Sequence, residues 1–95
     1  MTPEQVLSAS TALWNRDRLE LASDEVLAQL LDRGSLADWR ALYAMAQDDR
    51  ALRLRIIALV ARVPMYLPHL WLAAMRSLGE AVDEDATATN DGLLA

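Results

Sequence analysis

The sequence has no cysteine and only one histidine, His69, among its 95 residues. Without thiols the chain forms no disulfide and offers no thiolate ligand to a metal. A single imidazole also excludes a metal site built on two histidines of one chain, and a nucleophilic triad would have only His69 as its base. His69 follows Pro68 at the expected start of a helix, and we interpret it as a partly exposed helix-start residue. We therefore predict no metal, no cofactor and no enzymatic activity.

Glycine and long apolar runs are also scarce. The three glycines stand far apart, at positions 34, 79 and 92, so a glycine-rich phosphate loop is excluded. No apolar run approaches the ~18 residues that a membrane span needs. The first ten residues, MTPEQVLSAS, lack the basic leader and apolar block of a secretory signal. The sequence thus predicts a soluble, cytoplasmic protein.

Lysine and phenylalanine are absent, and all nine basic residues are arginine. Together with the abundance of alanine and leucine, this bias is typical of a GC-rich bacterial gene. The net charge of −5 is unevenly distributed, because residues 1–79 hold nine acids and nine arginines, whereas residues 80–95 hold five acids and no base. A neutral body does not attract phosphate, so nucleic acid is disfavoured as a partner.

What the sequence does contain is a high apolar content, 54%, arranged with helical spacing. Capping residues, prolines and glycines divide the chain into five predicted helices, whereas alternating strand patterns are missing. Gly34 is expected in the left-handed conformation that ends a helix, and Gly79 is expected to end the last helix. The predicted helices cover residues 3–16, 24–33, 36–47, Asp48-Asp49 to Pro64, and 68–78.

The apolar stripes of these segments predict one core, which is all that a chain of this size can build. In segment 36–47 the predicted inward arc contains Leu36, Trp39 and Tyr43, and the outward face contains Asp38 and Ala41. That outward face is a poor set for reading bases, so segments 24–33 and 36–47 are not interpreted as a DNA-binding helix-turn-helix.

The predicted fold is all-α, a compact bundle or HEAT-like array of about five short helices, with the helix ending at Pro64 at its centre. Residues 1–79 form the single predicted domain. Residues 80–95 have no helical periodicity and little to bury, so we expect a disordered, flexible acidic tail.

Two apolar features exceed what one small core can hide. The central helix carries a second apolar patch beside its main stripe, and the loop between Pro64 and Pro68 is unusually apolar. We therefore predict a noncatalytic protein–protein interaction module, with self-association into a homo-oligomer as one mode of interaction. The candidate partner-binding residues are Leu54, Ile57, Met65, Tyr66, Leu67 and His69.

An alternative prediction is a small antitoxin-like or transcription-regulatory protein that acts on a partner protein or on DNA. In that interpretation the acidic tail would imitate nucleic acid or cover a basic partner, and the apolar end of the sequence, residues 92–95, would serve as a degradation signal. No small-molecule substrate and no membrane partner is expected.

Overall fold

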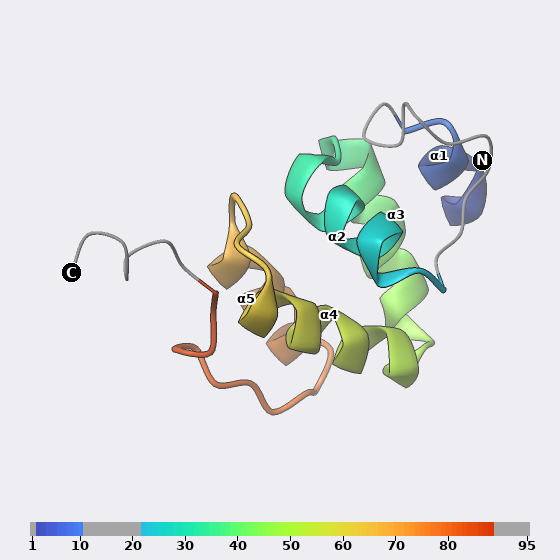
Figure 1. Ribbon diagram of the computed structural model, residues 1–95. Helices are drawn as coiled ribbons and strands as arrows, with labels where there is room; N and C mark the ends of the chain where they lie inside the picture. Colours follow the sequence, from blue (N-terminus) through green and yellow to red (C-terminus); the bar gives the residue numbers. More distant parts are fainter. Residues whose placement is uncertain (1, 11–21, 89–95) are drawn as a thin grey trace.

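The structure, a computed structural model, describes residues 2–10 and 22–88. These residues contain five helices and no strand (Figure 1). The all-α prediction is confirmed for these ranges. No helix in them is long and apolar enough to cross a membrane. The helices are α1 (Pro3–Ser8), α2 (Asp24–Arg33), α3 (Leu36–Gln47), α4 (Arg50–Arg62) and α5 (Pro68–Ser77).

The N-terminal caps explain why most helix starts were predictable. The hydroxyl of Ser23 accepts a hydrogen bond from the third amide of α2, and the Asp49 carboxylate does the same for α4. Such caps satisfy amides that have no partner within the helix. The predicted bounds of α2 and α3 are confirmed at both ends. The last helix, α5, ends at Ser77, one residue earlier than predicted, and Gly79 after it has a positive φ of 97°.

The first helix is shorter than predicted. It begins at Pro3 as expected but ends at Ser8, not at residue 16. Serine hydroxyls compete with helical hydrogen bonds, and the Ser10 hydroxyl donates to Asp38 of α3 (Oγ to Oδ2, 2.6 Å). The rest of the predicted segment, with Trp14, lies outside the described residues.

Gly34 also differs from prediction, because its backbone is extended (φ −65°, ψ 153°) and not left-handed. Because Gly34 has no side chain, the Leu30 carbonyl and the Trp39 ring can lie close to its backbone. A Cβ at this position would lie 2.4 Å from the Leu30 carbonyl oxygen and 3.0 Å from the Trp39 ring. The glycine thus lets Trp39 reach the end of α2.

The core lies between α4 and its neighbours, since α4 packs on α2, α3 and α5, while α1 packs on α3. The predicted central position of α4 is shared with α3, which packs on α1, α2 and α4. The largest fully enclosed side chains are mainly leucines, with one methionine, one isoleucine and two valines: Leu7, Val26, Leu27, Leu30, Leu31, Leu42, Ile56, Val60, Leu72 and Met75.

The buried face of α3 differs from the predicted one. Asp38 and Ala41, expected outside, are buried, whereas Leu36, expected inside, is 63% exposed. The cause is α1, which packs against α3 and covers the side on which Asp38 lies. Asp38 tolerates this burial because it accepts hydrogen bonds from the Ser35 amide (2.9 Å) and the Ser10 hydroxyl.

Residues 80–88 contain no helix, as predicted, but they make contacts that the expectation of a flexible tail did not include. The chain runs back past α4 (Figure 1). The Glu80 carboxylate accepts a hydrogen bond from Arg53 of α4 (2.7 Å), and the Ala88 amide donates to the Val60 carbonyl (2.9 Å). Between these points Val82 packs against the core. The remainder of the predicted tail, residues 89–95, lies outside the described residues.

Candidate interaction surface

An apolar groove lies between α3 and α5 and has a volume of about 340 Å³. Its lining is aromatic and aliphatic apart from one arginine. Two of its side chains are large apolar groups in contact with solvent, because Leu36 is 63% and Leu70 48% exposed. The residues that line the groove are Leu36, Trp39, Arg40, Tyr43, Leu70, Trp71 and Ala74.

Two tryptophans join the walls of the groove. Trp39 of α3 meets Trp71 of α5 edge to face, with ring centroids 5.6 Å apart and planes at 72°. Their indole N–H groups donate to consecutive carbonyls in the last turn of α2, Trp39 to Leu30 (2.9 Å) and Trp71 to Leu31 (3.1 Å). Carbonyls in the last turn of a helix have spare capacity to accept hydrogen bonds, and these two bonds anchor both rings to α2.

A second contact between α3 and α5 is polar. The Tyr43 hydroxyl lies 2.8 Å from the Ser77 hydroxyl, and Ser77 also donates to the Ala74 carbonyl (2.6 Å). The tryptophan pair and this hydrogen bond hold the two helices in register. The three aromatic side chains of the groove are thus each held by a hydrogen bond.

Arg40 is the charged member of the groove. It is exposed, and it forms no ion pair with any residue in the described ranges, whereas the other six arginines there each pair with an acid. The groove thus combines apolar surface with one uncompensated positive charge.

No family model, curated protein or solved structure matches this chain. The chemistry of its surfaces is accordingly the basis for assigning a role.

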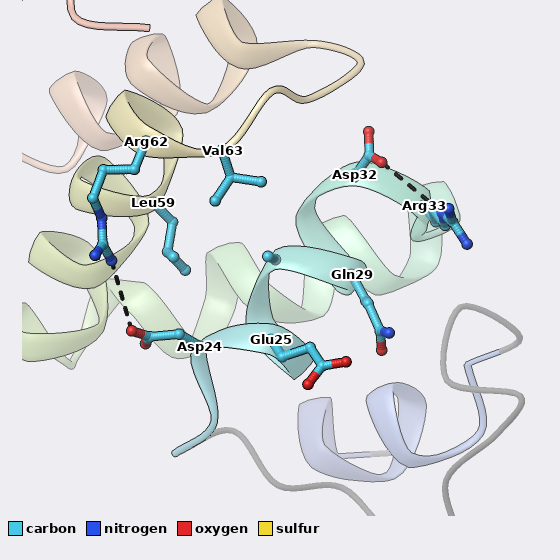
Figure 2. A pocket seen from close by; sticks show the side chains of 9 residues that line it. Asp24, Glu25, Gln29, Asp32, Arg33, Leu59, Arg62 and Val63 are labelled. Carbon is cyan, nitrogen blue, oxygen red and sulfur yellow. Dashed lines mark ion pairs between the residues drawn. The ribbon is translucent and has the colours of Figure 1, made fainter. Parts of the chain in front are cut away.

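A second cleft, of about 520 Å³, lies between α2 and α4 and is lined by charged side chains (Figure 2). Asp24 of α2 receives Arg55 (2.9 Å) and Arg62 (3.7 Å), both from α4. At the other end, Arg33 lies 3.9 Å from Asp32. These charges compensate one another. The ion pairs of Asp24 join α2 to α4, so the charged residues of this cleft have a structural role.

The ion pairs of α4 use acids that the sequence did not single out. Glu80 is contacted by Arg53 and, at 3.7 Å, by Arg50. The hydrogen bond from Arg53, followed by the attraction of both guanidinium groups, holds the pKa of the Glu80 carboxyl below its usual value, although partial burial opposes this effect. The four arginines of α4 therefore form ion pairs with acids of the same chain.

None of the six predicted partner-binding residues lines either cleft. Met65 and Ile57 are half-buried and pack against the core, whereas Leu54 is 46% exposed on α4. The loop residues Tyr66 (75% exposed) and Leu67 are accessible, and His69 is exposed at the start of α5.

The structure gives the loop before α5 one defined anchor. The Tyr66 amide donates to the Asp32 carboxylate at the end of α2 (2.8 Å). No group of three or more metal-ligating side chains gathers in the part of the chain that the structure describes.

Sequence reasoning missed the groove because its walls come from two helices whose neighbours were unknown. Leu36 was assigned to the core, and Leu70 was not singled out. The available signal was the spacing of Leu36, Trp39, Arg40 and Tyr43, which is the i, i+3, i+4, i+7 pattern of a helix that packs on another helix.

Proposed function

We propose that this domain is a noncatalytic protein-interaction module and that the groove between α3 and α5 is its partner-binding surface. The observation that carries the proposal is the exposure of Leu36 and Leu70 beside the tryptophan pair. Exposed apolar surface next to aromatic side chains is typical of the centre of a protein interface, where burial of a few such residues supplies most of the binding energy.

The noncatalytic assignment rests on the position of His69, which lines neither the groove nor the charged cleft. Partners of two kinds fit the proposal, a second copy of this chain or a different protein. The loop residues Tyr66 and Leu67 remain a candidate second contact, because they are accessible at the start of α5.

A regulator that acts through its acidic tail is the less favoured function. Such a role needs carboxylates that are free to meet a basic partner. Glu80 and Glu84 instead pair with Arg53 and Arg76 of the same domain. Two of the five acids that follow Gly79 are thus already engaged.

A photo-crosslinking amino acid placed at position 36 tests the proposal in a lysate of the source organism. We expect crosslinks from position 36, to another protein or to a second copy, and their loss when Leu70→Asp is added. Leu54→Asp is the matched control, because Leu54 is as exposed as Leu70 but lies outside the groove. Equal effects of the two aspartates, with circular dichroism unchanged, would refute the assignment of this surface.

A further inference from the structure

The chemistry of the groove also restricts what occupies it, provided that the proposed function holds. Arg40 is exposed beside an apolar surface and lacks an ion-pair partner, unlike the other arginines in the described ranges. An apolar ligand that covered the groove would remove water from this guanidinium without compensating its charge. A carboxylate on the occupant would compensate it.

The same charge disfavours a symmetric homodimer through this surface. In a two-fold interface each patch meets an identical patch, and no acidic residue lines the groove, so neither copy would supply a carboxylate to Arg40 of the other. Both guanidinium groups would then lose water without compensation of their charge. The occupant favoured by charge is therefore a different chain.

The shape of the groove favours a helix. The α3 wall presents Leu36, Trp39, Arg40 and Tyr43, which lie on one face over two helical turns, about 10 Å of axis. The opposite wall presents Leu70 and Ala74, one turn apart on α5. Two neighbouring helices with such ridges form the kind of channel into which the side-chain ridge of a third helix packs.

We infer that the groove between α3 and α5 binds an amphipathic helix of another protein, which carries large apolar residues at i, i+3 or i+4, and i+7 and an acidic residue that pairs with Arg40. The apolar ridge replaces the water on Leu36 and Leu70. The acidic residue sets the orientation of the helix, because Arg40 lies on the α3 wall and is the one charged residue that lines the groove.

A displayed peptide library tests this inference with the intact chain. The library is a helical 16-residue peptide with fixed leucines at the apolar positions and random residues at the positions that flank them. We expect wild-type protein to enrich Asp and Glu at a flanking position, and Arg40→Glu to enrich Lys and Arg there. Arg33→Glu is the matched control, since it makes the same charge change on an exposed α2 residue outside the groove.

The most enriched peptide is then synthesised and its binding is measured by fluorescence anisotropy. We expect Arg40→Glu to weaken binding about five- to tenfold, as for the loss and reversal of an exposed ion pair, and 0.5 M salt to reduce this difference. Arg33→Glu should leave the affinity unchanged, and Leu70→Asp should abolish binding.

The outcomes separate the inference from the proposed function. Peptides that bind without a charge preference, respond to Leu70→Asp and ignore Arg40→Glu would overturn the acidic helix but leave the groove as an interaction surface. A library that yields no binder, or a homodimer that dissociates on Leu36→Asp, would overturn the helix from another protein as occupant. In both of these cases crosslinking from position 36 still reports on the groove.

Discussion

Removing the indole N–H of Trp71 should destabilise the fold more than removing that of Trp39. Both rings donate to the last turn of α2, but their acceptors differ. The Leu30 carbonyl, which accepts from Trp39, also accepts from the Gly34 amide at 3.0 Å. It therefore keeps one hydrogen bond when Trp39 loses its donor.

The Leu31 carbonyl accepts no second hydrogen bond from the residues that the structure describes. In a longer helix the Ser35 amide would reach it, but that amide donates to Asp38 instead. Trp71 is only 2% exposed, so water does not replace its N–H. Loss of this donor leaves a buried acceptor unsatisfied and should cost about 1–3 kcal/mol, against about 0.5–1.5 kcal/mol at Trp39.

The measurement requires a change that keeps the shape of the ring. Benzothienylalanine has a sulfur in place of the indole N–H, so it removes the donor and creates no cavity. Urea unfolding followed by circular dichroism then gives the loss of stability, and 2 kcal/mol corresponds to a midpoint about 1–2 M lower. A loss at Trp39 equal to or larger than that at Trp71 would refute the reasoning.

Three further predictions concern residues whose environments the structure defines. Asp38→Ala should cost about 1–3 kcal/mol in urea unfolding, because it removes the acceptor of the Ser35 amide at the start of α3, and a change below about 0.5 kcal/mol would contradict this role. Gly34→Ala should cost about 1–3 kcal/mol through the contact of its Cβ with the Leu30 carbonyl, and a thermal midpoint equal to that of wild type would show that the backbone yields freely. Glu80→Gln should be less stable than wild type at neutral pH, because the folded state lowers the pKa of the Glu80 carboxyl. This stabilisation is present above the ordinary pKa of 4.5 and is lost as the pH falls through the folded-state pKa. The urea midpoints of the two proteins should therefore converge in acid. Midpoints that stay equally far apart from pH 7 to pH 3 would refute the role assigned to the charge.

The helices were predictable because their signals are local. Ser23 lies directly before α2 and Ser35 directly before α3, and each caps an amide three residues away. The large apolar residues of α2 form one stripe and are all buried: Val26, Leu27, Leu30 and Leu31. Local caps and periodicity thus determine where the helices lie.

The orientation of α3 was not predictable from such signals. Its sequence is apolar over a wide arc, so either Leu36 or Ala41 could face the core, and the choice depends on where α1 packs. The same dependence on distant neighbours explains why Asp24 and Glu80 were missed as partners for the arginines of α4. The groove belongs to this class, because it exists only where α3 and α5 meet.

The segment after α5 bears on the apparent excess of apolar residues in α4. Arg53 and Val60, which hold Glu80 and Ala88, lie on one helical stripe with Ile57 between them, and Ile57 is half-buried. Ile57, which belongs to the second apolar patch of α4, thus lies between the two points at which residues 80–88 are held. Tethering at both ends also links two distant observables: protonation of Glu80 should accelerate hydrogen exchange at the Ala88 amide, eight residues away along the chain.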